Sequence, residues 1–368
     1  MMPKSGFTLV ELLVVVAILS AIAATAFSLV TDGRIATARI DDTLARLTTL
    51  RRAILGLESP AWDGAVRLSG FVADNGRLPE SVSELVERPA GFAEQKSVMP
   101  RFSATVGPDC VQTGATPISA TDVSLMLTKG HRGNYLAGIA HNEGSTPVFR
   151  DGWGNRSTAD PANPDADKKN FGWLFTQSTT PDSNLIITSL GANNQIGVTS
   201  TVPENEDAET DRSTVVAPGD WQTANLNAWR VTLKVPTPLA GTSVTLTGAP
   251  ASGKFSVALL VFRNTDDVGR QWMQFNSQKG CGDSSDWDEN GTCTLIFDVN
   301  TACGGNPASA PFPLGRHLLL LLRENGDGGI DKIYAYKRGT EPAPDRYASA
   351  TPAFFPGTLP PPVTLEIR

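Results

Sequence analysis

One carboxylate, that of Glu11, lies in an otherwise apolar run near the N-terminus, and its position suggests a charge-pairing role. The run extends from Phe7 to Val30 and contains no other charged residue. At mid-membrane an acidic side chain costs about 2.5 to 3.5 kcal/mol on insertion scales. Glu11 is nearer the end of the run than its middle, so its cost is smaller. We nevertheless expect Glu11 to need a partner of opposite charge.

A short motif surrounds Glu11. In "KSGFTLVE" a lysine and Gly6 precede Phe7, and no small-residue cleavage site is obvious after the apolar run. This order resembles the cleavage and methylation signal of type IV prepilins and of type II secretion pseudopilins. The resemblance implies that prepilin peptidase cuts after Gly6 and methylates Phe7, and that Glu11 neutralises the α-amino group of an adjacent subunit. The alternative is an uncleaved signal anchor with an incidental Glu11.

Two further motifs resemble those of the major pseudopilin of type II secretion. They are "RDGWGN" at residues 150–155 and "NLIITSLGANNQIG" at residues 184–197. We expect tight turns at their glycines and Trp153 packed under a small sheet. The resemblance also implies calcium binding in the loop after the second motif, through backbone carbonyls and acidic side chains; the ligands would be Leu190, Asn193, Asp207 and Asp211. Asn193 replaces the usual Asp, and a solvated acidic loop is the alternative.

A second candidate calcium loop is "DWDENG". Asp286, Asp288 and Asn290 have the spacing that opens an EF-hand-like loop, whereas the closing position holds Phe297. Calcium is therefore the one cofactor that the sequence suggests. The alternative is an acidic, solvated turn between two strands.

Four cysteines occur in the chain: Cys110, Cys281, Cys293 and Cys303. If the body of the protein lies outside the cytoplasm, four cysteines allow three disulfide pairings. We favour Cys281 with Cys293 because they bracket a loop rich in glycine and aspartate. In the chain-entropy model such a bridge contributes about 3 kcal/mol. Buried free thiols are the alternative.

One long helix should carry the N-terminal motif. Beyond Val30 the apolar residues recur at three- and four-residue steps, at Ile40, Leu44, Leu47, Leu50 and Ile54. We expect the helix to end near Leu57, with Gly33 as a weak point. Its first half would pack in a membrane or filament core, and its second half under a globular head.

The rest of the chain divides into two predicted regions. In the first we expect a turn at Asn75-Gly76, then a short helix with a capping box of Ser81 and Glu84. From about Ser213, short alternating strands such as "AWRVTLKV" predict a β-sandwich. The predicted fold is α+β: a leader at 1–6, a transmembrane and amphipathic helix at 7–58, a pilin-like α/β head with a small β-sheet at 59–212 and an all-β sandwich at 213–368.

The composition and the motifs argue against two classes of function, nucleic-acid binding and catalysis. A net charge of −7 without a basic run argues against nucleic-acid binding. The three histidines have no zinc spacing, and we find no nucleophile elbow or phosphate loop, so we expect no enzyme. Trp272, Trp287 or Tyr334, if exposed, would suit stacking on sugars, although core packing is commoner.

The sequence therefore predicts a pseudopilin-like subunit of a type IV filament or type II secretion system, minor or specialised because of its large sandwich. Its expected partners are prepilin peptidase, other pseudopilins or pilins and the inner-membrane assembly platform. It would cross the bacterial inner membrane once, with its body in the periplasm. One alternative is a minor type IV pilin whose sandwich is an adhesin or binds glycans; another is a membrane-tethered hydrolase.

Overall fold

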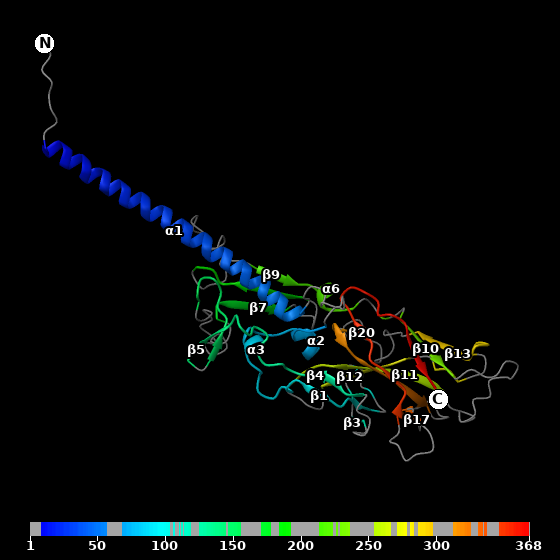
Figure 1. Cartoon of the computed structure of the whole chain (residues 1–368). Coiled ribbons are helices and arrows are strands. Elements are labelled where there is room, and N and C mark those ends of the chain that lie inside the picture. Colours follow the sequence, from blue (N-terminus) through cyan, green and yellow to red (C-terminus); the bar gives the residue numbers. More distant parts are fainter. Residues whose placement is uncertain are drawn as a thin grey trace, which may run out of the picture.

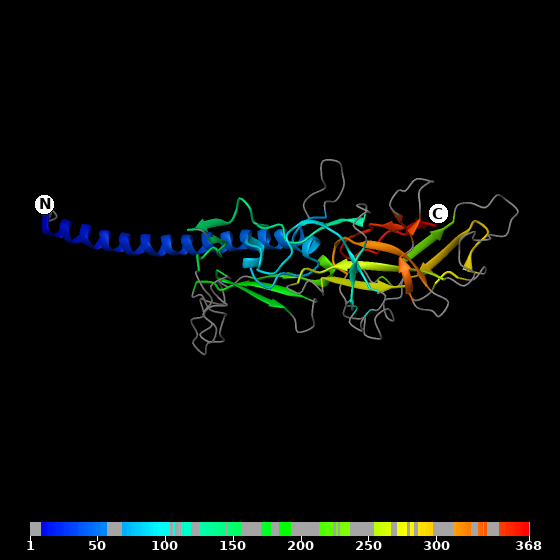
Figure 2. The same ribbon diagram turned by 90° about the horizontal axis from the view of Figure 1, so that it is seen from below.

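The chain forms a long helix attached to one end of an elongated body of β-sheets (Figures 1 and 2). This computed structural model describes residues 9–56, 68–103, 106, 110, 112, 114–118, 125–144, 146–155, 171–177, 184–192, 213–223, 226, 229–235, 254–265, 271–277, 280–282, 286–296, 312–324, 330–333, 335–336 and 346–367.

Helix α1 spans Leu9–Leu55 without interruption, so Gly33 does not break it. Its 47 residues correspond to a length of about 70 Å. It ends two residues before the predicted position, where the backbone N–H of Gly56 donates to the carbonyl of Arg52 at 2.7 Å. Its C-terminal part packs on the body. Leu47, Leu50 and Ile54 of the predicted apolar face are buried there, whereas Leu44 of the same face stays exposed.

The head contains a small antiparallel sheet beside the C-terminal part of α1. Its strands are β7 (Trp173–Gln177), β8 (Leu185–Ser189) and β9 (Ser213–Val216), in that order. Side chains of α1, this sheet, α2 (Phe71–Asn75) and α3 (Ser83–Val86) share one apolar core. A hairpin of β5 (His141–Glu143) and β6 (Thr146–Val148) completes the head.

The predicted capping box is wrong. Helix α3 begins after Val82 without a side-chain cap. The Glu84 carboxylate accepts a hydrogen bond from the backbone N–H of Glu80 at 3.1 Å and pairs with the buried Arg77 at 3.0 Å. Because burial strengthens this ion pair, Glu84 turns toward Arg77 and does not reach back to Ser81.

Two sheets form the C-terminal sandwich. The first has the order β13 (Thr292–Ile296), β10 (Arg230–Lys234), β21 (Val363–Glu366), with β10 and β21 parallel. The second has the order β12 (Trp272–Asn276), β11 (Phe255–Phe262), β15 (Leu318–Glu324), β16 (Ile330–Ile333), and β19 (Ser349–Ala350) also pairs with β15. Alternate side chains of both sheets meet in one core, which agrees with the predicted alternation in β10.

A segment of the first region covers the outer face of the second sheet. It carries β1 (Lys96–Val98), β2 (Arg101–Phe102), β3 (Thr116–Pro117) and β4 (Leu127–Lys129). Ile118, Leu125 and Leu127 pack there against side chains of β11 and β15. All eight residues of β11 are therefore buried, which explains why seven of the eight, all but Ser256, are apolar.

The predicted boundary at residue 212 falls directly before β9, which pairs with β8 of the head. Helix α6 (Pro218–Trp221) follows, and Trp221 is buried in the head core. The remaining strands form two small pairs, β14 (Gly315–Arg316) with β20 (Ala353–Phe354) and β17 (Ala335–Tyr336) with β18 (Arg346–Tyr347). The predicted strand in "TSVTLTG" lies outside the described residues.

Head and sandwich meet backbone to backbone at Gly76, which ends α2 in the predicted turn. Its φ is +70°, and a Cβ there would lie 1.8 Å from the carbonyl oxygen of Phe262. Only glycine fits such an approach without moving β11. The contact holds the sandwich directly against α2.

Candidate functional site

The N-terminal part of α1 exposes apolar side chains on all sides. Leu9 is 79% exposed, Leu13 64% and Ile22 58%, and the helix projects from the body there (Figure 2). Glu11 lies in the first turn of α1 and is exposed. No helix in the described part of the chain reaches the combined length and hydropathy of a membrane span. A continuous apolar surface of this kind marks a site of interaction.

A comparison with known protein families finds a match in the same N-terminal segment. Residues 1–27 match the family model "Prokaryotic N-terminal methylation motif". The chain carries the type IV prepilin and pseudopilin signal. This prepilin-type signal implies processing by prepilin peptidase, assembly with pilins and a subunit associated with the cell envelope. No curated protein and no solved structure matches the chain. Gly6 and Phe7, the predicted processing residues, lie outside the described residues.

The two internal motifs of this prepilin-like chain come together at a buried carboxylate. Asp151 accepts hydrogen bonds from the backbone N–H of Asn155 at 3.0 Å, from the Asn155 amide at 2.7 Å and from the Ser189 hydroxyl at 2.9 Å. The Asn155 amide also donates to the carbonyl of Gly191 at 2.7 Å. We call Asp151, Asn155, Ser189 and Gly191 the Asp151 node.

The surroundings of the Asp151 carboxylate fit a role in holding the two motifs together. Burial raises the pKa of Asp151, while hydrogen bonds from Asn155 and Ser189 act to lower it. Because its oxygens accept bonds from both motifs, the carboxylate fixes the 150–155 turn to the end of β8. The node thus also fixes Gly191, just after β8.

The node also rests on α1. Gly152 lies so close to the helix that a Cβ would come within 2.3 Å of the Arg39 carbonyl oxygen, and its N–H donates to the Thr43 hydroxyl at 3.1 Å. Trp153 does not pack under the sheet as predicted; its ring lies 5.5 Å from the guanidinium carbon of Arg39 on α1. Trp173 occupies the core position and donates to the Phe149 carbonyl at 2.9 Å. A sequence motif alone cannot tell which tryptophan faces α1.

The first predicted calcium site is only partly described. Leu190 is buried, and its N–H donates to the Gly172 carbonyl at 3.0 Å. Asn193, Asp207 and Asp211 lie outside the described residues. Calcium in this loop stays a prediction.

The structure describes Asp286, Asp288 and Asn290 of the second predicted loop, and calcium there stays a prediction. Asp288 accepts hydrogen bonds from the N–H groups of Asn290 at 2.9 Å and Thr292 at 2.8 Å, and from the Thr292 hydroxyl. Asp286 accepts one from the N–H of Gly282 at 2.9 Å. The bonds from Thr292 lower the pKa of Asp288. Within the described ranges, no three His, Cys, Asp or Glu side chains gather as metal ligands.

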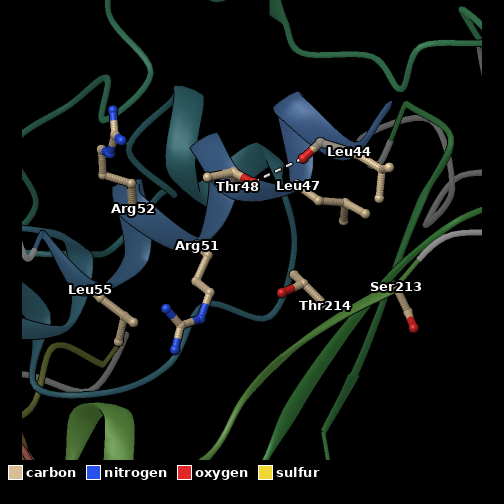
Figure 3. A pocket seen from close by; sticks show the side chains of 8 residues that line it. All are labelled: Leu44, Leu47, Thr48, Arg51, Arg52, Leu55, Ser213 and Thr214. Atoms are coloured by element: carbon tan, nitrogen blue, oxygen red, sulfur yellow. Dashed lines mark hydrogen bonds between the residues drawn. The ribbon is translucent and has the colours of Figure 1, made fainter. Parts of the chain in front are cut away.

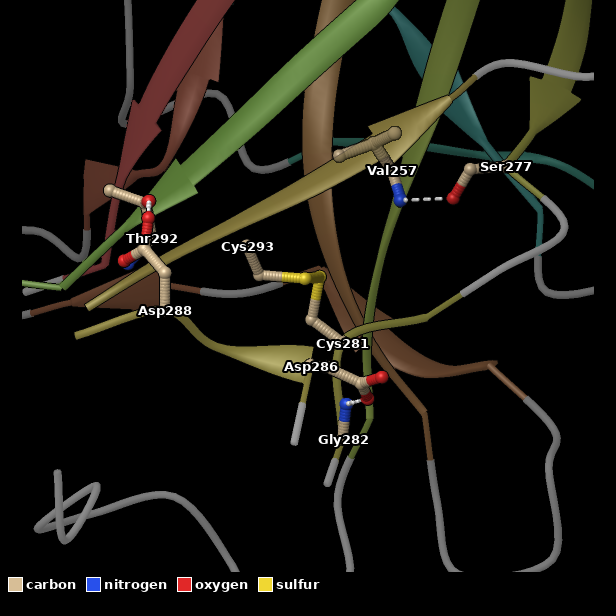
Figure 4. Close-up of a disulfide and its surroundings, with 8 residues drawn as sticks. All are labelled: Val257, Ser277, Cys281, Gly282, Asp286, Asp288, Thr292 and Cys293. Carbon is tan, nitrogen blue, oxygen red and sulfur yellow. Dashed lines mark hydrogen bonds between the residues drawn. A yellow bond between two sulfur atoms is a disulfide. The ribbon is translucent and has the colours of Figure 1, made fainter. Parts of the chain in front are cut away.

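The predicted disulfide between Cys281 and Cys293 is present (Figure 4). The backbone of Cys281 forms an isolated antiparallel β-bridge with Phe255 at the start of β11, and Cys293 lies on β13. The bridge therefore joins the two sheets of the sandwich through their common core. Cys110 is also disulfide-bonded, so no described cysteine is a free thiol.

A groove of about 450 Å³ runs between α1 and β9 (Figure 3). Its walls combine apolar, hydroxyl and guanidinium groups, from Leu44, Leu47, Thr48, Arg51, Arg52, Leu55, Ser213 and Thr214. Arg51 pairs with Asp220 of α6 at 2.8 Å. These lining residues include no acid–base pair. Trp272 is 2% exposed and packs on Phe262, so it has no free face for stacking on a sugar.

Proposed function

We propose that this chain is a pseudopilin-like subunit of a type IV filament, assembled into the periplasmic pseudopilus of a type II secretion system. The observation that carries the proposal is the prepilin signal at residues 1–27 directly before a helix with an exposed apolar surface. A helix that is apolar on all sides needs lipid or other helices around it. Insertion in the inner membrane before assembly, and packing in a filament core afterwards, would satisfy that need. The role is structural, not catalytic.

We further propose that the subunit is minor and lies at the filament tip. The sandwich lies beyond the C-terminal end of α1, on the side opposite the exposed apolar half (Figure 1). If α1 runs along the filament axis, the sandwich occupies space that the next subunit would need. Repeating this chain along the filament would therefore create clashes, whereas a terminal position avoids them.

The far position of the sandwich also favours a second candidate, a minor type IV pilin with an adhesive domain. Such a domain acts best at the end away from the membrane. A glycan array probed with the detergent-extracted chain tests this candidate: selective binding would support it, and the absence of binding to sugars or to cells would count against it.

Intact-mass analysis tests the main proposal. The chain is extracted from membranes of a host with and without prepilin peptidase. We expect loss of residues 1–6 and gain of one methyl group only when the peptidase is present. An unprocessed chain, or one cut after the apolar run, would contradict the proposal. Recovery of the chain as the dominant species in sheared filaments would contradict only the tip position.

A further inference from the structure

A second pocket lies at the junction of head and sandwich. Its volume is about 490 Å³, within the usual range for small-molecule sites. The walls come from α2, β4 and β14 and from the segments beside them, with charged groups at Asp74, Lys129, Arg132 and Arg316. We call it the junction pocket.

The charges of the junction pocket do not balance. Three cationic side chains, Lys129, Arg132 and Arg316, line it together with a single acid, Asp74. Arg132 pairs with Asp74 at 2.8 Å. Two positive charges therefore remain, on Lys129 and Arg316, without an acid of their own among the lining residues.

Lys129 is the least accessible of these cations. The residue is 3% exposed, and its ammonium donates one hydrogen bond, to the Ala73 carbonyl at 2.7 Å. An ammonium has three donors, and a buried charge is costly unless it is paired. Burial lowers the pKa of Lys129 to about 8, whereas nearby Asp74 raises it. An acceptor in the pocket would stabilise this ammonium.

Part of the wall is apolar. Leu68, Ala73, Met126 and Leu127 contribute to it. A ligand that fills the pocket would therefore need an apolar body in addition to its charge. A divalent anion without such a body would leave this wall uncovered.

We propose that the junction pocket binds a small ligand with one carboxylate and a short apolar body. The carboxylate accepts hydrogen bonds from Lys129 and Arg316, and the body lies on Leu68 and Met126. Charge-assisted bonds of this kind are the stronger class of hydrogen bond. Because the walls come from both head and sandwich, the bound ligand stabilises their junction. The proposal does not depend on the filament role.

Isothermal titration calorimetry with hexanoate on the full chain tests this site. Acetate, inorganic phosphate and hexanol are compared at equal ionic strength. We expect hexanoate to bind more tightly than acetate and phosphate, and hexanol not to bind. Arg316→Gln should weaken hexanoate binding about tenfold. Arg230→Gln, which removes an exposed arginine of β10, is the matched control and should bind like the wild type.

Substitution of Lys129 and NMR titration of its ammonium provide a second test of the junction pocket. Lys129→Met should abolish hexanoate binding, and in the wild type NMR should show a higher Lys129 pKa when hexanoate is bound. The groups facing this ammonium, Asp74 and His317 among them, are unchanged in that comparison. If Lys129→Met does not fold, the comparison of hexanoate binding by Arg316→Gln and Arg230→Gln still tests the proposal. No hexanoate binding, equal binding by both arginine variants, or equal affinity for phosphate or hexanol would overturn the proposal.

Discussion

Asn75 of α2 and Asn264, just after β11, are 189 positions apart and are joined by a hydrogen bond of 2.8 Å between their buried side-chain amides. Asn264 also accepts from the N–H of Ala93 at 3.0 Å and donates to the carbonyl of Ala93 at 3.1 Å. One side chain thus ties together α2, the segment that covers the second sheet and the sandwich. Head and sandwich are one continuous structure at this point.

Replacement of Asn264 by alanine should weaken the whole fold. It leaves the Asn75 amide oxygen and both backbone groups of Ala93 without this partner, at an expected cost of about 2 to 4 kcal/mol in the free energy of unfolding. Urea unfolding of the full chain measures it. The control is Asn142→Ala at an exposed position of β5, which should change stability by less than about 0.5 kcal/mol. Equal effects of the two variants would mean that Asn264 does not join the regions.

Substitution of Asp151 should reduce the free energy of unfolding about as much as substitution of Asn264. Asp151→Ala removes the acceptor of the Ser189 hydroxyl and of two Asn155 groups, and we expect a loss of about 2 to 4 kcal/mol in unfolding free energy. Asp42→Ala removes an exposed carboxylate that pairs with Arg46 on α1, and its cost should not exceed about 0.5 kcal/mol. Thermal and urea unfolding compare the two. A small effect of Asp151→Ala would contradict the organising role of the node.

Acid should destabilise the protein through His317. This ring is buried, its Nε2–H donates to the Pro313 carbonyl at 2.8 Å, and burial lowers its pKa to about 3. Because an unfolded histidine has a pKa near 6.5, the unfolded state binds the proton first as pH falls. Neutral His317 therefore makes its full contribution to the free energy of unfolding above about pH 6.5. This contribution declines as the pH falls toward about 3, and at pH 5 the loss is about 2 kcal/mol.

The change in unfolding free energy between pH 7 and pH 5 measures this effect. In His317→Gln, whose amide can still donate to Pro313, the change should be smaller by that amount. His141→Gln is the control because His141 is exposed on β5, and it should keep the wild-type change. Identical pH dependence in all three proteins would exclude His317 as the titrating group.

The Cys281–Cys293 bridge should stabilise the sandwich. The double variant Cys281→Ala/Cys293→Ala should lose about 3 kcal/mol in the chain-entropy model, for a bridge with a sequence separation of 12. Urea unfolding of both proteins without reductant measures the loss. With reductant present the two midpoints should converge. An unchanged midpoint in the double variant would mean that packing alone holds the two sheets together.

Under the proposed function, Glu11→Gln should permit processing and impair assembly. The substitution removes the charge but leaves Gly6 and Phe7 intact, so the mass change caused by prepilin peptidase should remain while incorporation into sheared filaments falls. Glu87→Gln, at an exposed position after α3, is the control and should assemble like the wild type. Normal incorporation of the Glu11 variant would contradict the charge-pairing role.

Local signals in the sequence were sufficient for several features. The prepilin signal is a continuous motif that the family comparison confirms. The long helix, the alternating strand β10 and the turn at Gly76 follow from periodicity and backbone preference, which depend on neighbouring residues. The loop rich in glycine and aspartate between Cys281 and Cys293 also indicates their pairing, although it does not show that the bridge joins two sheets.

The contacts between distant segments are not visible in local sequence patterns and are set by the folded structure. Glu84 turns to Arg77 and not to Ser81, and Trp153 lies on α1. Ile118, Leu125 and Leu127 cover the second sheet of the sandwich. These outcomes depend on which buried groups become neighbours after folding, and such neighbours are set by packing and by satisfaction of buried polar groups. The N-terminal signal and the local elements follow from neighbouring residues. Packing over long sequence distances decided how head, sandwich and junction pocket are built.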